Sequence, residues 1–206
     1  MKPVVITGTD TGVGKTVFAA GLTAALGAQY WKPVQSGLEE TTDSQIVAEL
    51  SKCPVLPEAY RLRRPASPHL AAEDMGLEID LGRLDLPQVD GPLVVEGAGG
   101  VMVPLNRKTF FIDLMSRWKA PVILVARTQL GTINHTALSL KALRAAGCPL
   151  LGVAFVGTAE PDVEQTITEM CAVRHLGRLN LLADLTHETL THDFRNIDLD
   201  AIRAAL

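Results

Sequence analysis

A glycine-rich segment between a β-branched run and a helical pattern constrains this chain more than any other feature. The run covers residues 4–7, the segment reads Gly8-Thr-Asp-Thr-Gly-Val-Gly-Lys-Thr16, and an apolar helical pattern follows over residues 17–26. Glycines allow backbone N–H groups to converge on one point, and the N-terminus of the following helix adds partial positive charge. We therefore expect a phosphate-binding loop, in which Lys15 reaches the β- and γ-phosphates and the Thr16 hydroxyl ligates Mg²⁺.

The spacing of this loop is unusual. Such loops commonly read G-x-x-x-x-G-K-[ST], whereas five residues separate Gly8 from Gly14 here. A glycine-rich turn that carries Gly-Lys-Thr by chance is the alternative interpretation. The strand before the segment and the helix after it favour the phosphate-binding loop, as a variant of the usual one.

Short β-branched runs alternate with helical patterns along the chain. Strands are expected at residues 4–7, 30–34, 93–95, 122–126 and 151–156, and helices at 16–26, 43–50, 111–118, 135–146 and 162–174. This alternation is typical of a mostly parallel sheet with helices on both faces. The sequence thus predicts an α/β fold, a three-layer sandwich like that of P-loop NTPases, in one domain spanning residues 1–206. Residues 54–91 are expected to form an insertion of loops and short helices.

Composition excludes several classes of function. The net charge of −4 offers no general positive field for a nucleic-acid backbone. No apolar run approaches the ~20 residues of a membrane-spanning helix, and the first residues lack the pattern of a signal peptide, so we expect a cytoplasmic protein. The three cysteines, Cys53, Cys148 and Cys171, lack the spacing of a zinc site or redox pair and are interpreted as reduced core thiols.

Three charged residues follow predicted strands or begin a predicted helix. Lys32 stands near the end of the second strand, and Glu96 ends the third and precedes a run of small residues, Gly97-Ala98-Gly99-Gly100. Ligands of open α/β sheets bind beyond the carboxyl ends of the strands, so Lys32 is expected to face the phosphate-binding loop and Glu96 to serve Mg²⁺. A solvated lysine and an ordinary strand-end acid are the alternatives. Asp43 is either a second acid of the site or a helix N-cap.

Two weaker signals are Ser67-Pro68-His69 and Leu130-Gly-Thr-Ile-Asn-His135. Asn134 precedes a helix whose N-terminus would suit an anionic group such as a substrate carboxylate, but capping explains it equally well. His69 and His135 have no partner in the sequence that suggests a catalytic pair, so structural roles are favoured.

Taken together, these motifs resemble the dethiobiotin synthetase family over residues 4 to about 157. They are Gly8-Thr-Asp-Thr-Gly-Val-Gly-Lys-Thr16, Lys32-Pro-Val-Gln-Ser-Gly37, Ser67-Pro-His69, Val95-Glu-Gly-Ala-Gly-Gly100 and Leu130-Gly-Thr-Ile-Asn-His135. The resemblance implies a homodimeric, magnesium-dependent ligase of biotin synthesis. Such a ligase uses ATP and CO₂ to close a cyclic urea on 7,8-diaminononanoate, through a carbamate and a carbamic–phosphoric anhydride.

The resemblance also implies a role for each matching residue. Lys15 and Lys32 are the implied catalytic residues, and Asn134 is implied to meet the substrate across the dimer interface. The implied nucleotide and cofactor contacts are Gly12, Val13, Gly14, Lys15, Thr16, Val17, Asp43, Glu96, Gly97, Ala98 and Gly99; the implied Mg²⁺ ligands are Thr16, Asp43 and Glu96; and the implied substrate contacts are Thr11, Ser36, Gly97 and Asn134.

This chain departs from the family pattern at three places. Gly12 stands where some relatives carry an acidic residue, so an acidic side chain at this position can neither order the loop nor take part in catalysis here. The Asn that often reads adenine is missing from Val156-Gly-Thr158, and Gly177-Arg-Leu-Asn180 lacks the usual proline. The base preference is therefore open, other nucleoside triphosphates are candidates beside ATP, and residues after 157 have no assigned function.

A regulatory ATPase of the partition and cell-division type is the main alternative of another class. Those switch proteins usually carry an additional early lysine in a Lys-Gly-Gly loop, whereas this chain has Gly8-Thr9-Asp10 at that place. The C-terminal residues 198–206 also lack a basic face for a membrane surface. Both observations favour the ligase.

Overall fold

A seven-stranded sheet forms the centre of the structure, a computed structural model that describes residues 3–206. In space the strands follow the order β4-β2-β6-β1-β7-β8-β9, and every pairing between them is parallel. In chain order they are β1 (Val4–Gly8), β2 (Gln29–Trp31), β4 (Val55–Leu56), β6 (Leu93–Gly100), β7 (Val122–Arg127), β8 (Leu150–Val156) and β9 (His175–Leu179). The predicted parallel α/β sheet is confirmed.

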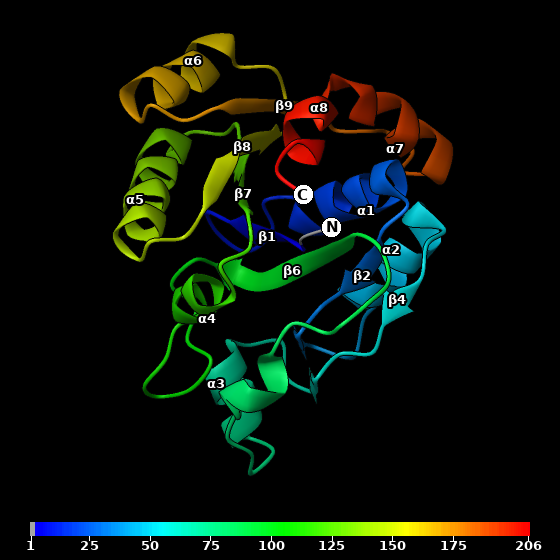
Figure 1. The fold of residues 1–206 in the computed structure, drawn as a ribbon, viewed down its shortest axis with the longest axis vertical. Helices are drawn as coiled ribbons and strands as arrows, with labels where there is room; N and C mark the ends of the chain where they lie inside the picture. The colour runs from blue at the N-terminus through cyan, green and yellow to red at the C-terminus, as the bar shows by residue number, and fades with distance from the viewer. Residues whose placement is uncertain (1–2) are drawn as a thin grey trace.

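Helices cover both faces of this sheet (Figure 1). One layer contains α1 (Lys15–Leu26), α2 (Asp43–Ser51), α7 (His187–Asp193) and α8 (Leu199–Arg203), and the other contains α4 (Phe111–Trp118), α5 (Thr132–Ala145) and α6 (Pro161–Met170). Successive strand residues point to opposite faces, so Val4 and Ile6 pack in one buried cluster while Val5 packs in the other. The predicted three-layer sandwich is confirmed.

The sheet reverses its direction of growth at β1. From β1 the chain crosses to β2 on one side, whereas β7, β8 and β9 extend the sheet on the other side. Such a reversal opens a crevice beyond the carboxyl ends of the strands. The glycine-rich loop that follows β1 and the ends of β2 and β6 meet at this crevice.

The prediction of one strand over residues 30–34 was wrong, because two shorter strands stand there. β2 ends at Trp31, and β3 (Val34–Ser36) pairs with β5 (Tyr60–Leu62) in a separate two-stranded parallel sheet. Pro33 between them has no N–H for a ladder and restricts the backbone of Lys32. Lys32 therefore stands at the junction of the two sheets.

The insertion contributes more regular structure than the sequence predicts. It holds β4 and β5 as well as α3 (Pro68–Glu73) and the 3₁₀ helix η1 (Leu81–Leu84). β4 pairs with β2 at the edge of the main sheet, so the start of this region belongs to the sheet. The remainder packs beside β3 and lies below the sheet in Figure 1.

Two predicted helices have different boundaries in the structure. α5 begins at Thr132, three residues early, because Gly131 adopts a left-handed conformation (φ +92°) directly before it. α6 ends at Met170, and the next residues lead into β9, a strand that the sequence did not reveal.

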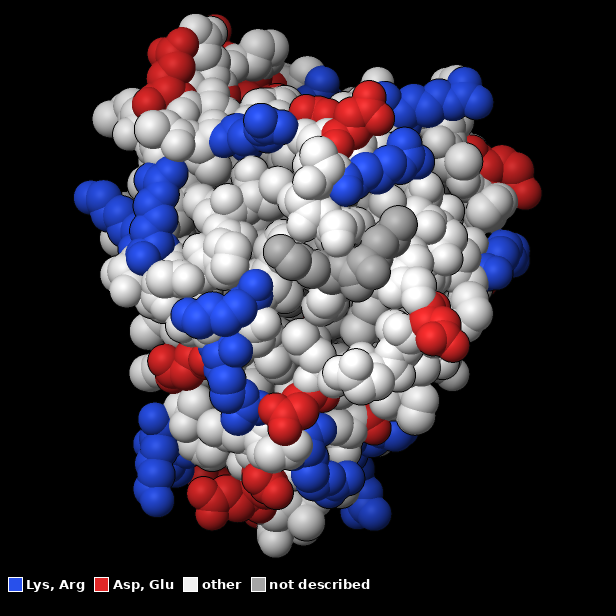
Figure 2. All heavy atoms as spheres, in the orientation of Figure 1, with Lys and Arg blue, Asp and Glu red and all other residues white. Residues whose placement is uncertain are grey.

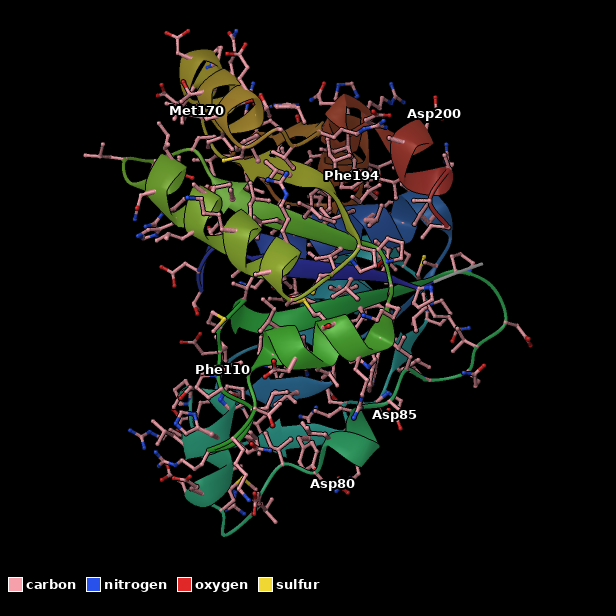
Figure 3. The ribbon with its side chains drawn as sticks, turned by 60° about the vertical axis from the view of Figure 1, so that its left-hand side comes forward. Asp80, Asp85, Phe110, Met170, Phe194 and Asp200 are labelled. Atoms are coloured by element: carbon pink, nitrogen blue, oxygen red, sulfur yellow. The ribbon has the colours of Figure 1, made fainter. Side chains whose placement is uncertain are left out.

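The C-terminal segment packs onto α1. A second 3₁₀ helix, η2 (Phe194–Asn196), joins α7 to α8, and the ring centroids of Phe18 and Phe194 lie 5.3 Å apart. Phe194 points into the protein between the C-terminal helices and α1 (Figure 3). Gly21 of α1 has room for this ring only because it lacks a side chain, since a built Cβ there would lie 2.2 Å from it.

The surface carries both signs of charge. Lys and Arg side chains are interspersed with Asp and Glu on the face shown in Figure 2. Within residues 3–206, no helix has the length and apolar character that crossing a membrane requires.

Candidate active site

The glycine-rich loop leads directly into α1. Gly12 (φ +72°) and Gly14 (φ +94°) adopt left-handed conformations, which glycine adopts without steric cost. These turns place Lys15 at the first position of α1, where its side chain is buried and its Nζ donates to the carbonyl oxygen of Asp10 at 2.7 Å. Desolvation by burial lowers the pKa of Lys15 to about 8. The negative charges around Lys15 therefore do not compensate for its desolvation, as expected of a side chain that binds an anionic ligand.

Two carboxylates meet beside this loop. The Thr16 hydroxyl oxygen lies 2.9 Å from Asp43 Oδ1 and 3.0 Å from Glu96 Oε1. Asp43 is the first residue of α2, and the N-cap of that helix is Thr42, so the interpretation of Asp43 as the cap was wrong. The structure brings all three predicted magnesium ligands to one place.

Lys32 joins these two carboxylates. Its Nζ lies 2.5 Å from Asp43 Oδ2 and 3.0 Å from Glu96 Oε1, and it also donates to the carbonyl oxygen of Gly97 at 3.1 Å. Burial alone would lower the pKa of Lys32, but the charges of Glu96 and Asp43 and its hydrogen bonds to them outweigh burial and raise it. The pKa of Asp43 is lowered, because its interactions with Lys32 outweigh its own desolvation. The interpretation of Lys32 as a solvated strand-end lysine was wrong.

The oxygen donors fit a hard divalent cation. Thr16, Asp43 and Glu96 offer a hydroxyl and two carboxylates, the type of ligand that Mg²⁺ prefers, and Mg²⁺ is usually completed by substrate phosphates and water. The donor set therefore suits Mg²⁺ that arrives with a nucleotide.

A cavity of about 440 Å³ opens on the Lys32 side of this cluster. Its lining includes Thr11, Lys32, Ser36, Asp43, Ala98 and Gly99. The Ser36 hydroxyl is buried and has no hydrogen-bond partner in the described structure, although buried polar groups are nearly always paired. The cavity thus lies beside a buried ammonium and a buried hydroxyl that has no partner in the described structure.

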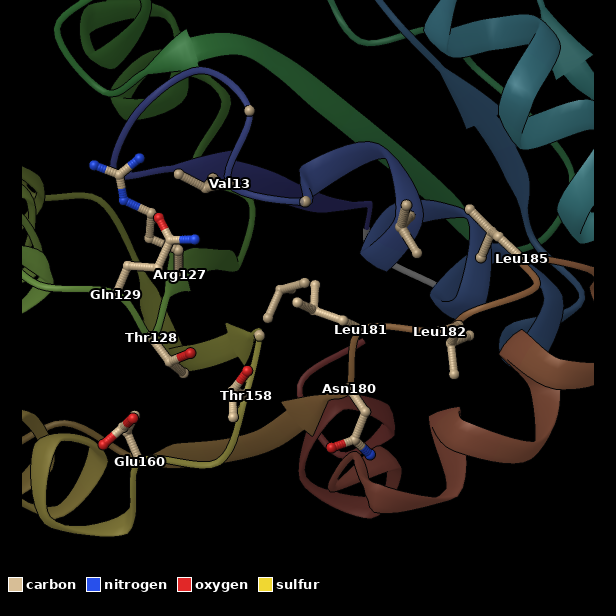
Figure 4. Close-up of a pocket in the computed structure, with 15 residues that line it drawn as sticks. Val13, Arg127, Thr128, Gln129, Thr158, Glu160, Asn180, Leu181, Leu182 and Leu185 are labelled. Atoms are coloured by element: carbon tan, nitrogen blue, oxygen red, sulfur yellow. The ribbon is translucent and has the colours of Figure 1, made fainter.

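A second cavity, of about 470 Å³, lies on the other side of the loop. Gly12, Val13, Gly14 and Val17 form one wall, and the opposite wall comes from the segments after β7, β8 and β9 (Figure 4). Those segments contribute Thr128, Thr158, Glu160, Asn180 and Leu181, among others. No function was predicted for residues after 157, yet several of them complete this cavity.

Asn180 is held firmly in that wall. Its backbone N–H and its amide Nδ2 both donate to Asp193, at 2.7 and 2.6 Å, while its Oδ1 accepts from Arg178. Both ends of the amide are thus engaged within the protein. Only the departure from the family pattern at Gly177-Arg-Leu-Asn180 could have drawn attention to this segment.

Asn134 and the two singled-out histidines lie away from the cluster. Asn134 is exposed in the first turn of α5 and lines neither cavity described above. His69 belongs to α3 and borders a small separate hollow beside Arg107, and His135 is exposed on α5. A role for Asn134 across an interface stays a prediction.

The fold and the loop define a P-loop nucleotide-binding protein of the α/β class. Residues 2–189 match the family model described as AAA domain. Among solved structures, the chain is similar to a ParA family ATPase from Chlorobium tepidum TLS (10% identity, 99% of this chain and 97% of that chain, TM-score 0.58). It is also similar to the MinC:MinD cell division protein complex of Aquifex aeolicus (12% identity, 99% and 96%, TM-score 0.56). At these identities the likeness shows the fold alone.

Curated relatives are far more similar in sequence. The ATP-dependent dethiobiotin synthetase BioD of Rhodopseudomonas palustris (strain HaA2) is 58% identical over 97% of this chain and 95% of the relative. The same-named protein of Brucella anthropi is 59% identical over 93% and 92%. This chain belongs to the ATP-dependent dethiobiotin synthetase family, and the distant switch-type ATPases do not favour the regulatory alternative.

Proposed function

We propose that this protein closes 7,8-diaminononanoate to dethiobiotin with ATP and CO₂, releasing ADP and phosphate. The convergence of Lys32, Asp43 and Glu96 on the threonine of the phosphate-binding loop carries this proposal. Lys32 also lines a cavity with room for a small diamine, which supports the proposal. The active unit is taken as one domain, residues 1–206, of which Met1 and Lys2 lie outside the described residues.

The two lysines serve the first chemical step. One amine of the substrate takes up CO₂ and loses a proton to form a carbamate, whose oxygen then attacks the γ-phosphorus and displaces ADP. A carbamate and a triphosphate repel each other, and Lys15 and Lys32 offset that repulsion from either side. Mg²⁺ held by Thr16, Asp43 and Glu96 would supply further positive charge at the phosphates when bound.

Ring closure requires less catalytic help from the protein than the first chemical step does. The second amine attacks the carbonyl carbon of the carbamic–phosphoric anhydride, its proton leaves, and phosphate departs as the cyclic urea forms. Both groups lie on one small molecule, so proximity can contribute about 7–11 kcal/mol. Ser36, Thr11 and the backbone of Gly97–Gly99 are the proposed substrate contacts. The unpaired Ser36 hydroxyl and the small residues along this wall support these roles.

The second cavity is the proposed site of the nucleoside, with Gly12–Val17 around the phosphates and Ala98 and Gly99 toward the γ-phosphate. The asparagine that often reads adenine in the family is missing from Val156-Gly-Thr158, which supports acceptance of other nucleoside triphosphates beside ATP. A homodimer with Asn134 at its interface, the absence of nucleic-acid and membrane partners, and a place in the cytoplasm are further parts of the proposal that rest on the sequence.

The direct test is incubation with diaminononanoate, bicarbonate, Mg²⁺ and each nucleoside triphosphate, with detection of the cyclic urea by mass. Urea should form with ATP and also with at least one other triphosphate. Nucleotide hydrolysis that a protein partner or lipid stimulates, with no urea from any mixture, would contradict the proposed reaction. Urea from ATP alone would contradict only the relaxed base preference.

A further inference from the structure

Tyr30 lies directly behind the carboxylate cluster. It is fully buried in β2, and its hydroxyl donates to Glu96 Oε2 at 2.8 Å. Tyr30 pairs with Val94 and Trp31 with Val95 in the register of β2 against β6, so Lys32 comes next to Glu96 as the chain continues. Residues two apart on a strand share a face, and Tyr30 and Lys32 thus reach the same carboxylate from one side of the sheet.

The two oxygens of Glu96 have separate partners. Oε1 faces the site, where it accepts from Lys32 Nζ and lies within hydrogen-bond distance of the Thr16 hydroxyl, both at 3.0 Å. Oε2 faces the interior and accepts from the Tyr30 hydroxyl. The Glu96 side chain has no exposed surface, so no solvent can replace the tyrosine as the donor to Oε2.

Tyr30 is rigidly placed for this contact. Its ring belongs to the buried cluster between the sheet and α1, and a ring that is enclosed on all sides in a close-packed interior has few alternative positions. A phenolic hydroxyl is a donor and an ionised carboxylate can only accept, so this contact is a hydrogen bond from Tyr30 to Glu96.

We propose that Tyr30 is a positioning residue that reserves Glu96 Oε2 for the protein and presents only Oε1 to a divalent cation, which favours Mg²⁺ over Ca²⁺. Ca²⁺ accepts six to eight ligands and often takes both oxygens of a carboxylate, whereas Mg²⁺ demands six in near-octahedral geometry. A carboxylate restricted to one oxygen suits the smaller ion. This inference rests on the proposed use of Mg²⁺ at the site, and it adds a residue that no motif of the sequence marked.

The test is Tyr30→Phe, which keeps the ring and removes the donor. ADP binding is measured by calorimetry with Mg²⁺ and with Ca²⁺, without the diamine. A hydrogen bond to a charged group is typically worth a factor of ten or more, so the ratio of the two affinities should move toward Ca²⁺ by about tenfold. Tyr60→Phe is the matched control, because Tyr60 is the only other tyrosine and its hydroxyl accepts from the backbone of Asp80 in the insertion.

Each outcome bears on the inference. An unchanged Mg²⁺-to-Ca²⁺ ratio in folded Tyr30→Phe, or the same change in Tyr60→Phe, would overturn it. If Tyr30→Phe does not fold, a crystal structure of the unaltered protein with ADP and Mg²⁺ decides. The expected result is Tyr30 on Oε2, and a Glu96 that turns both oxygens to the metal would refute the inference. ADP binding needs no urea, so loss of the proposed reaction in the unaltered protein would leave this result standing.

Discussion

Binding of a nucleotide should draw a proton onto Lys15. Its pKa of about 8 means that roughly half of the free protein carries a neutral Lys15 at pH 8 and about nine-tenths at pH 9. Phosphate oxygens beside the amine favour its charged form. We expect uptake of roughly 0.5 proton per nucleotide at pH 8 and about 0.9 at pH 9. If only the charged form binds, the apparent Kd rises about tenfold between pH 7 and pH 9.

Calorimetry of ADP binding in buffers with different ionisation enthalpies measures this uptake directly. Phosphate groups lose their second proton near pH 6, so at pH 8 and above the nucleotide itself contributes little. Lys15→Arg is the control, since arginine keeps its charge throughout this range and should abolish the pH-dependent uptake. Uptake near zero at both pH values in the unaltered protein, or equal uptake in Lys15→Arg, would refute the reasoning.

Three further predictions follow from the contacts described above. Lys32→Met should abolish urea formation. It should also destabilise the protein by about 3–5 kcal/mol in denaturant titration, because it leaves two buried acidic partners without their cation. The control Lys141→Met, on the exposed face of α5, should have neither effect. Gly177→Ala should lower the free energy of unfolding by about 3 kcal/mol or more, since the φ of Gly177 is +108° and a Cβ would lie 2.1 Å from the backbone oxygen of Asn196. In the control Gly76→Ala the added Cβ meets no atom within 4 Å, so the loss should be only about 1–2 kcal/mol. Equal losses in the two variants would contradict the predicted clash. The pKa of Asp43 is lowered in the folded protein, so its carboxylate contributes stability above the usual aspartate pKa of 3.8. This contribution is lost as the pH falls through the lower folded pKa. Asp43→Asn should therefore weaken the dependence of the free energy of unfolding on pH in the acid range, and an unchanged dependence would contradict the role given to Asp43.

The sequence predicted the centre of the site well, for a physical reason. Lys32 directly follows the end of β2, whereas Glu96 lies within β6, which runs on to Gly100 and does not end at residue 95 as predicted. Both still lie toward the carboxyl ends of parallel strands, and such ends share one edge. Thr16 is fixed by the loop that the glycines dictate. A parallel sheet therefore predicts that Thr16, Lys32 and Glu96 lie close together. The distances from Glu96 Oε1 to the Thr16 hydroxyl and to Lys32 Nζ, both 3.0 Å, confirm this.

Other parts of the structure depend on contacts that no local pattern reveals. β9 contains Gly177 and Arg178 among its five residues, so it lacks the β-branched run that marked the other strands. The wall formed by Asn180 and Leu181 is a coil that gains its role only by packing opposite the loop. No motif marks Tyr30, because its hydroxyl reaches Glu96 only through the pairing of β2 with β6.

Because of the break at Pro33, the two sides of the cavity proposed for the diamine belong to two separate hydrogen-bond ladders. Lys32 continues from the strand that is registered against β6, whereas Ser36 belongs to the small sheet with β5. Exchanges in β5 or α3 can therefore reshape the far wall while the strands that present the charged groups keep their alignment. The length of diamine that the proposed pocket accepts can thus change in evolution without altering the residues proposed for phosphoryl transfer.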